Sequence, residues 1–149
     1  MKDFLSLNNQ LCFAIYETAG EFNKLYTSVL QPFGLTYPQY LVLLALWEKD
    51  EVSMKELGAR LGLGTGTLTP MITRMQENGW VRKERSTEDE RKVFIYLEEK
   101  ARRDQVPITA RIAEEIQLCN ISLSEYDELM TRLNELDQKL KERSNSAGV

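Results

Sequence analysis

Apolar residues recur at helical spacing along most of this 149-residue chain. The first such stripe lies within residues 4–31 and predicts a long amphipathic helix. Its apolar positions are Leu7, Leu11, Ile15, Phe22, Leu25 and Val29. Pro32 and Gly34 end this helix, and Thr36 and Pro38 begin a second one. The second helix is apolar on almost every side, which is typical of a helix buried at the centre of a fold.

Two shorter helical patterns, joined by a glycine-bearing turn at residues 62–64, occupy the middle of the chain. The first begins with Ser53 and Glu56, which match the S-x-x-E pattern of a capping box. The second covers about residues 65–78. Pro70 falls inside it and is expected to remove one backbone hydrogen bond or to introduce a slight kink. The predicted buried stripe of this helix consists of Leu68, Ile72 and Met75.

Two β-like runs follow, at residues 81–85 and 93–97, with the charged loop STEDERK between them. The order over about residues 52–97 is therefore helix, turn, helix and a two-stranded wing. This is the order of a winged helix-turn-helix, in which one short helix enters the major groove of DNA. The pattern predicts a mainly α protein with a small β-wing.

The C-terminal third of the chain is predicted to be helical. One helix covers residues 98–119, with a bend at Pro107, and the capping-box pair Ser122 and Glu125 begins the last helix. This last helix is expected to end near Arg143 and to leave the tail SNSAGV frayed. Its heptad seam consists of Leu129, Leu133, Leu136 and Leu140.

The long terminal helices suggest how the chain associates. A single domain covering residues 1–149 does not need both a heptad seam and a long amphipathic N-terminal helix. Two copies that pack the helices at about 4–31 and 98–143 together would use both. We therefore expect a homodimer with two-fold symmetry, in which these helices form the dimerisation part. The alternative is that the seam packs back on the core of its own chain.

Composition and charge are compatible with a globular protein that binds nucleic acid. The chain is 42% hydrophobic and 28% charged, and no apolar run approaches the ~20 residues of a membrane span. It also lacks an N-terminal signal-peptide pattern, so we expect no membrane contact and a cytoplasmic location. The formal net charge of −4 divides into +3 for residues 52–103 and −7 for the rest. A basic segment in an acidic body can neutralise phosphates locally, although ordinary scatter gives differences of this size too.

The absence of histidine narrows the possible chemistry. It excludes Ser-His-Asp and Cys-His catalysis and argues against most catalytic zinc and non-haem iron sites. The two cysteines, Cys12 and Cys119, are too few for a zinc ribbon and are expected to be reduced in a cytosolic protein. We therefore expect no enzyme, no metal site and no cofactor. Taken by itself, Cys12 is most simply interpreted as a buried structural cysteine.

Three segments of the chain resemble the MarR family of bacterial repressors. They are LCFAIYE, LTYPQYLVLLALWE and GTLTPMITRMQENGWVRKERSTEDERKVFIYL. The resemblance covers about residues 9–101 and, more loosely, the C-terminal helices. The D-x-R of the wing, at Asp89 and Arg91, occurs across that family. The cysteine in LCFAIY together with LTYPQY resembles the OhrR type, which consists of repressors that sense organic hydroperoxides.

The resemblance implies a dimer whose fourth helices enter successive major grooves, while each wing places Arg91 in the neighbouring minor groove. Half-sites one helical turn apart would make the operator in double-stranded DNA pseudo-palindromic. Arg91 suits a narrow A·T-rich groove, Asp89 can hold its guanidinium, and Arg74 can reach guanine or a phosphate. Many relatives have an acidic or amide residue where this chain has Gly64, so a weaker helix cap is expected. The other candidate DNA contacts, each of which is alternatively plain solvated surface, are Thr65, Gly66, Thr67, Thr69, Arg82, Lys83, Arg85 and Lys92.

For Cys12 the resemblance implies a thiol that reacts with peroxide. The thiolate is the attacking form, and neutral donors are its expected support because no cation lies close to Cys12 in the sequence. If the helix begins near Ser6, Cys12 lies beyond the first turn and the helix dipole contributes little. Tyr26 and Tyr37 match tyrosines that hydrogen-bond the reactive sulfur across the dimer interface, and Tyr16 matches a third that contributes to the switch. A phenol hydroxyl that donates to sulfur favours its ionised form.

Cys119 matches the second cysteine of a two-cysteine subtype, near the end of the fifth helix. In that subtype, oxidation of the first cysteine leads to an intersubunit disulfide, which requires Cα atoms within about 7 Å. The implied protein is a redox-sensing repressor that organic hydroperoxide releases from its operator through a disulfide between Cys12 and Cys119.

Three other functions remain open. One is a MarR-type repressor released by a non-covalent aromatic ligand, with Cys12 inert. Another is a thiol peroxidase that uses Cys12 and Cys119, although nothing in the chain resembles a peroxidase active-site motif. The third is a helical interaction module whose winged helix binds protein instead of DNA.

Overall fold

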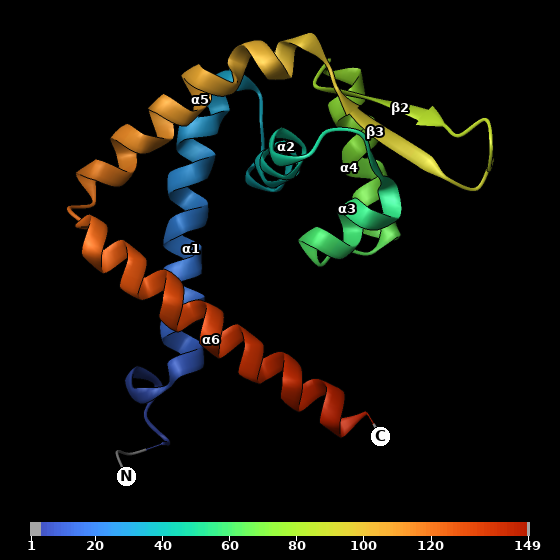
Figure 1. Cartoon of the computed structure of the whole chain (residues 1–149). Helices are drawn as coiled ribbons and strands as arrows, with labels where there is room; N and C mark the ends of the chain where they lie inside the picture. Colours follow the sequence, from blue (N-terminus) through green and yellow to red (C-terminus); the bar gives the residue numbers. More distant parts are fainter. Residues whose placement is uncertain (1–3, 149) are drawn as a thin grey trace. The chain divides into compact units, whose positions relative to one another are not determined.

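The computed structural model describes residues 4–148, which form mainly helices and one small sheet (Figure 1). In chain order the elements are η1 (Leu7–Asn9), α1 (Leu11–Leu30), η2 (Gln31–Phe33), α2 (Tyr37–Glu48), β1 (Val52–Ser53), α3 (Met54–Leu61), α4 (Thr65–Glu77), β2 (Val81–Arg85), β3 (Val93–Leu97), α5 (Glu99–Leu118) and α6 (Leu123–Ala147). The chain divides into two compact units, Met1–Ile112 and Ala113–Val149.

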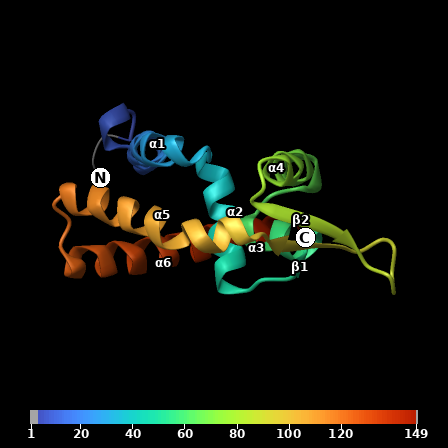
Figure 2. The same cartoon turned by 90° about the horizontal axis from the view of Figure 1, so that it is seen from above.

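The sheet is antiparallel and has the strand order β1-β3-β2. β2 and β3 have the bounds expected from the sequence, and their register places Lys83 opposite Ile95. The short strand β1 was not predicted; it pairs Val52 with Ile95 and Ser53 with Phe94. The wing formed by β2 and β3 extends past α4 to its tip, as two views agree (Figures 1 and 2). Because β1 leads directly into α3, its pairing holds the start of α3 beside the wing.

The core of the first unit lies among α2, α4 and the sheet. α2 begins at the predicted N-cap, Thr36, whose side chain accepts a hydrogen bond from the backbone of Gln39. The fully buried side chains include Val42, Leu43 and Leu46 from α2, Leu68, Ile72 and Met75 from α4, and Ile95 from β3. The prediction of a central second helix and of the α4 stripe is therefore confirmed.

Asp50, which follows α2, connects the end of this helix to the junction between β3 and α5. Its Oδ1 accepts a hydrogen bond of 2.9 Å from the backbone N–H of Leu97, and its Oδ2 accepts one of 2.8 Å from Arg102. Nearby, the indole N–H of Trp47 donates to the carbonyl of Ala101 at 3.1 Å. These three bonds link residues about fifty positions apart, and they hold the base of the wing against the central helix.

The turn between α3 and α4 depends on two glycines. Gly62 has a φ of +67°, the left-handed conformation that glycine adopts without strain. Gly58 lies under the turn, where a Cβ atom would come within 2.8 Å of the carbonyl oxygen of Leu63. Gly64 is the N-cap of α4 and makes no side-chain capping bond, as its residue type leads one to expect. Pro70 lies inside the helix.

Three sequence predictions about helix ends are corrected. α1 begins at Leu11 instead of residue 4, because Gln10 is extended and the 3-10 turn η1 precedes it. α6 continues to Ala147, past the predicted end at Arg143, so the residues of the tail up to Ala147 are helical. Only half of the predicted capping box forms at α3: Ser53 accepts from the backbone N–H of Glu56, whose carboxylate instead pairs with Lys49 at 2.8 Å.

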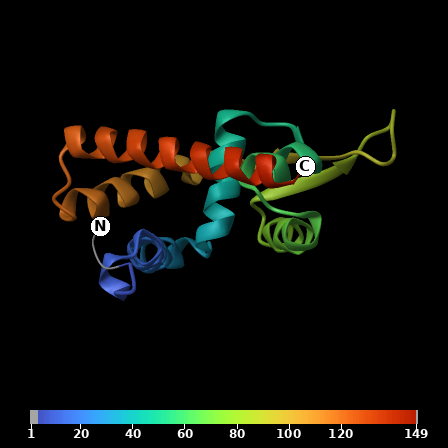
Figure 3. The same cartoon turned by 90° about the horizontal axis from the view of Figure 1, so that it is seen from below.

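The apolar faces of α1 and α6 are largely uncovered. Only Val29 and Leu30, at the end of α1, are buried, and no described residue of α6 is. Within the first unit, α1 (blue) is set apart from the sheet, as the view along its axis in Figure 3 shows. Among the described residues, no single helix is long and apolar enough to span a bilayer; Leu11–Phe33 and α2 pass that test only as a pair bent by 76°.

Candidate DNA-binding surface and the two cysteines

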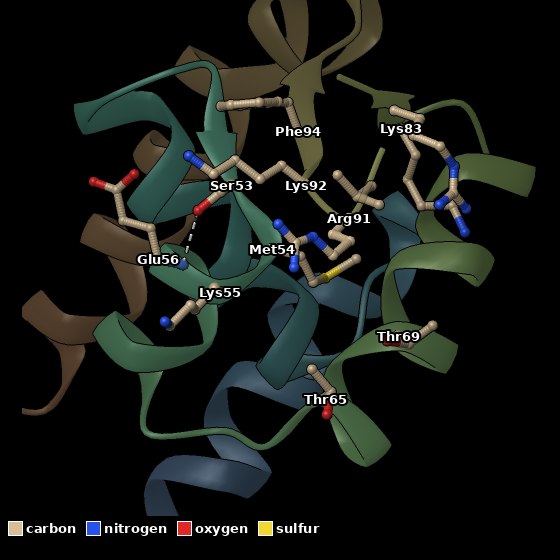
Figure 4. Close-up of a pocket in the computed structure, with 12 residues that line it drawn as sticks. Ser53, Met54, Lys55, Glu56, Thr65, Thr69, Lys83, Arg91, Lys92 and Phe94 are labelled. Carbon is tan, nitrogen blue, oxygen red and sulfur yellow. Dashed lines mark hydrogen bonds between the residues drawn. The ribbon is translucent and has the colours of Figure 1, made fainter. Parts of the chain in front are cut away.

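A groove of about 860 Å³ lies between α3, α4 and the wing. Figure 4 shows Thr65 and Thr69 on α4, with Arg91 and Lys92 from the wing around the same space. The groove is lined by Ser53, Met54, Lys55, Glu56, Thr65, Thr69, Lys83, Arg85, Arg91, Lys92, Val93 and Phe94. Five of these side chains are cationic, and the carboxylate of Glu56 is paired with Lys49 outside the groove. The surface therefore suits a polyanion.

Lys83 connects the wing to the helix across from it. Its Nζ donates a hydrogen bond of 3.2 Å to the hydroxyl of Thr73, and that hydroxyl donates one of 3.0 Å to the carbonyl of Thr69. Thr65 and Thr69, one helical turn apart, lie on the same flank of α4 and face the groove. The wing and the helix thus present one joined surface.

The tip of the wing is a hydrogen-bonded turn that presents Arg91. The hydroxyl of Ser86 accepts from the backbone N–H of Asp89, and the N–H of Lys92 donates to the carbonyl of Asp89. Asp89 Oδ1 accepts from both the backbone N–H and the Nε of Arg91, at 3.1 and 3.2 Å. The Arg91 side chain is nevertheless 92% exposed. Asp89 therefore orients the guanidinium, and the Arg91 side chain remains accessible to a ligand.

Arg82 points to the other face of the wing. Successive residues of a strand alternate in direction, and Arg82 is the neighbour of Lys83, which faces α4. Its guanidinium lies 4.5 Å from the centre of the Tyr96 ring and within 3.0 and 3.7 Å of the carboxylates of Glu84 and Glu98. The hydrogen bond to Glu84 raises the pKa of Arg82, and the attraction of both carboxylates adds to it. Arg82 thus lies within 4 Å of two carboxylates of its own chain on the face of the wing away from α4, whereas the ion pair of Arg91 is with Asp89.

The remaining predicted contacts divide into two groups. Lys83, Arg85 and Lys92 line the groove, together with Arg91. Gly66, Thr67 and Arg74 are exposed on α4 but do not line it.

Six residues that line the groove were not predicted as DNA contacts: Ser53, Met54, Lys55, Glu56, Val93 and Phe94. The S-x-x-E signal locates the start of α3, but only the pairing of Ser53 with Phe94 brings that start to the wing.

Cys12 is exposed and is the second residue of α1. This corrects two expectations: the cysteine is not buried in its own chain, and it does not lie beyond the first turn. The first backbone N–H groups of a helix have no intrahelical acceptors, and they favour negative charge nearby. Tyr16 lies one turn further along the same helix and is 77% exposed.

Tyr26 and Tyr37 form a stacked pair, with ring centroids 4.7 Å apart. Tyr40 adds a third ring, 5.6 Å from that of Tyr26. Tyr26 follows Cys12 by fourteen residues on one helix, a separation of about 21 Å along the helix axis. Within one chain the phenol of Tyr26 therefore does not reach the sulfur of Cys12.

Cys119 directly follows α5 and is also exposed. Its Sγ donates to the carbonyl of Glu115 at 3.4 Å, and Asn120 turns the chain with a φ of +57°. Within the second unit, Cys119 lines a depression together with Glu125 and Arg132. Among residues 4–148, no group of three or more His, Cys, Asp or Glu side chains is arranged to hold a metal ion.

The helix-turn-helix, the sheet and the cationic groove define a winged-helix regulator. The family described as "Transcriptional regulator SarA/Rot" matches residues 24–105. The chain belongs to this family of MarR-like winged-helix transcriptional regulators, and within it to the OhrR type. The predicted family, fold class and status as a regulator instead of an enzyme are therefore confirmed.

Three curated relatives support this assignment. The organic hydroperoxide resistance transcriptional regulator of Bacillus subtilis is 47% identical over 97 residues, which are 65% of this chain and 66% of that protein. TtmR of Methylorubrum extorquens is 53% identical over 97 residues, 65% of this chain but only 50% of TtmR. The matched segment thus spans half to two-thirds of these relatives. MgrA of Staphylococcus aureus is 33% identical over 147 residues, 96% of this chain and 100% of MgrA.

Solved structures of AbfR, a protein of Staphylococcus epidermidis, are similar over most of the chain. Reduced AbfR bound to DNA is 38% identical with a TM-score of 0.83, covering 91% of this chain and 93% of AbfR. Disulfide-formed AbfR has the same identity and a TM-score of 0.68, covering 91% of this chain and 90% of AbfR.

Proposed function

We propose that the chain is a dimeric DNA-binding repressor that organic hydroperoxide inactivates by oxidising Cys12. The observation that supports DNA binding is the groove between α4 and the wing, where Lys83, Arg85 and Arg91 lie among polar side chains. Arg and Lys side chains neutralise DNA phosphates, and a winged helix offers one helix to the major groove. A protein that acts on bacterial chromosomal DNA works in the cytoplasm.

A second copy of the chain is the proposed cover for the exposed helices. On α1, Leu11 is 62% exposed, and on α6, Leu129 and Leu133 are 52% and 50% exposed. Leucines spaced as in a heptad seam are stable in water only when another surface covers them. The winged helix-turn-helix of about residues 52–97, together with α2, is called the head below. A two-fold dimer has two such heads, and a pseudo-palindromic operator requires two. Light scattering at micromolar concentration tests this, and a monomer would contradict it.

The position of Cys12 supports the redox part of the proposal. The thiol is exposed in the first turn of α1, where an oxidant can reach it. In one chain Tyr26 is about 21 Å along the helix from Cys12, so the expected support of the sulfur by Tyr26 and Tyr37 requires those of a second copy. The stack between the two tyrosine rings would hold both phenols in one place. Tyr16 is close enough on the same helix to respond to a change at the sulfur.

The proposed chemistry has two steps. The Cys12 thiolate attacks an oxygen of the hydroperoxide, the O–O bond breaks, and the alcohol leaves after taking up a proton, which leaves a sulfenic acid on Cys12. The thiolate of Cys119 from the other copy then attacks this sulfur and expels hydroxide, which is released as water, to form a disulfide. Drawing the two sulfurs together would move helices at the dimer interface and change the spacing of the two heads.

Gel-shift assays with the DNA upstream of the chain's own gene test the proposal. The reduced protein should shift this DNA, and cumene hydroperoxide should abolish the shift. Non-reducing gels should then contain a covalent dimer that Cys119→Ser abolishes. If Cys12→Ser is still released by peroxide, the sensing role of Cys12 is wrong. Release by an aromatic compound alone, with no response to peroxide, would instead favour a non-covalent effector.

A further inference from the structure

The first two turns of α4 expose an unusual surface for a helix that enters DNA. Every exposed side chain in these turns is short and uncharged: Thr65, Gly66, Thr67, Thr69 and Pro70. The first exposed side chain that is long and charged is Arg74, in the third turn. An exposed helix surface normally has long polar residues, since they favour both the helix and solvation.

Nothing in the fold requires this composition. A Cβ atom at Gly66 would meet no atom within 4 Å, and Gly66 is the second residue of α4. Glycine therefore lowers the stability of the helix there without relieving any clash. Pro70 removes a backbone hydrogen bond of α4 and presents an apolar ring to solvent. Both residues lower the stability of the helix, and both allow a ligand to approach the helix backbone closely.

The positive charges lie elsewhere around the groove. Lys55 is on α3, and the wing supplies the others, among them Arg85 and Arg91. The hydroxyl of Thr73 is occupied within the protein by Lys83 and by the helix carbonyl of Thr69. The cationic side chains that can neutralise phosphates thus lie on α3 and the wing, while the first two turns of α4 expose the hydroxyls and methyl groups of threonines and an apolar ring.

We propose that α4 recognises the C5-methyl groups of thymine, through the γ-methyl groups of Thr67 and Thr69 and the ring of Pro70. In the major groove the thymine methyl is the apolar feature that distinguishes T·A from the other base pairs, and threonine methyls contact it well. In each half-site, the bases that α4 distinguishes are then thymines, and Arg74 contacts the adjacent base position. This inference rests on the proposed DNA binding and adds the chemical group that is read.

Uracil substitution tests the inference on the full-length, reduced protein. Duplexes are first selected from a random-sequence pool by that protein, and each thymine of a selected half-site is then replaced by uracil, one at a time. Uracil keeps every hydrogen-bonding group and removes only the methyl. We expect affinity to fall about fourfold for each contacted methyl, at two or three positions of each half-site. Equal affinity for the thymine and uracil duplexes at every position would overturn the inference while leaving DNA binding intact.

Matched variants of Thr69 assign the contact to a side chain. Thr69→Ser removes the methyl and keeps the hydroxyl, whereas Thr69→Val keeps the methyl and removes the hydroxyl. Thr69→Ser should lose discrimination between thymine and uracil at one position, and Thr69→Val should keep it; the reverse result would overturn the role of the methyl. Thermal unfolding of both variants checks that α4 is intact. If the protein selects no duplex at all, the inference falls together with the proposed DNA binding.

Discussion

α4 and α6 are both amphipathic helices with an apolar stripe, and the difference between them separates the two roles of the chain. The α4 stripe of Leu68, Ile72 and Met75 is completely buried. The α6 seam has no buried residue, and its Leu129, Leu133 and Leu140 are 52%, 50% and 55% exposed. The same periodicity thus produces a core in one case and, as we propose, an interface between copies in the other.

The two stripes differ in burial because the helices have different packing partners within their own chain. α4 packs against α2, α3 and β2, which together enclose its apolar side. α1 is similar to α6, because it buries only its last two residues. The head therefore supplies its own hydrophobic core, whereas the long helices leave apolar faces exposed that, as we propose, a second copy covers. Four predictions, each based on one substitution or a matched pair, follow from this division, from the largest expected effect to the smallest.

The two leucine stripes should respond differently to the same truncation. Leu68→Ala creates a cavity at a fully buried site and should lower the free energy of unfolding by about 2–5 kcal/mol in urea titrations. Leu133→Ala should leave the head folded and weaken self-association about tenfold or more, which sedimentation at several concentrations measures. If Leu133→Ala destabilises the fold without changing association, the α6 seam packs on its own chain.

Gly58, which lies under the turn between α3 and α4, should not tolerate an added methyl group. Gly58→Ala brings a Cβ within 2.8 Å of a backbone carbonyl, and we expect a loss of about 1–3 kcal/mol in the free energy of unfolding. The matched control is Gly20→Ala on α1, where no atom lies within 4 Å and where alanine should stabilise the helix by about 0.5–1 kcal/mol. Equal stability of the two variants would mean that the turn at Leu63 can shift freely.

Two arginines of the wing provide a matched pair for DNA binding. Arg91→Ala should weaken binding about tenfold in fluorescence anisotropy with the selected duplex, because Arg91 is 92% exposed and held in position by Asp89. Arg82→Ala should change affinity by less than about twofold, since Glu84 and Glu98 already neutralise this guanidinium on the other face. Comparable losses for both would place the DNA on both faces of the wing.

The smallest effect is expected at the ion pair between Lys49 and Glu56. The hydrogen bond from Lys49 lowers the pKa of Glu56 below its ordinary value of 4.5. Because the folded-state pKa is the lower one, the pair stabilises the fold above the unfolded value, and this contribution disappears as the pH falls through the folded pKa. Glu56→Gln should therefore be slightly less stable at pH 7 and should equal the parent only once the pH lies well below the lowered pKa of Glu56, in urea unfolding over a series of pH values. A difference that persists at low pH would exclude the ion pair as its cause.

Local patterns were sufficient to predict the head. The bounds of β2 and β3, the N-cap of α2 at Thr36 and the buried stripe of α4 all follow from signals within a few residues of each other. These elements pack against neighbours in the same chain, so burial follows the period of the hydrophobic pattern. The family resemblance also depended on this contiguous segment.

The helix ends and the groove did not follow from local patterns. Spacing reveals the stripe of α1, but its start depends on the extended conformation of Gln10, and this start decides whether Cys12 lies in the first turn. Likewise, Lys55 carries no signal of its own as a groove residue. It reaches the groove because β1 pairs with a strand more than forty residues later.

The sequence alone therefore determined the long helices and the two strands of the wing, because turn residues, caps and hydrophobic periodicity act over one or two turns of chain, whereas β1 and the exact helix ends did not follow from it. Through the family resemblance it also predicted the groups of the proposed switch, Cys12 and Cys119 with three tyrosines, and this stays a prediction. The tertiary structure decided which charges share a surface: it joined Lys55 and Arg91 in one groove and turned Arg82 away from it. Strand pairing and packing between distant segments set these positions, since neighbouring residues on a strand point to opposite faces and only the partner strand determines which face meets α4.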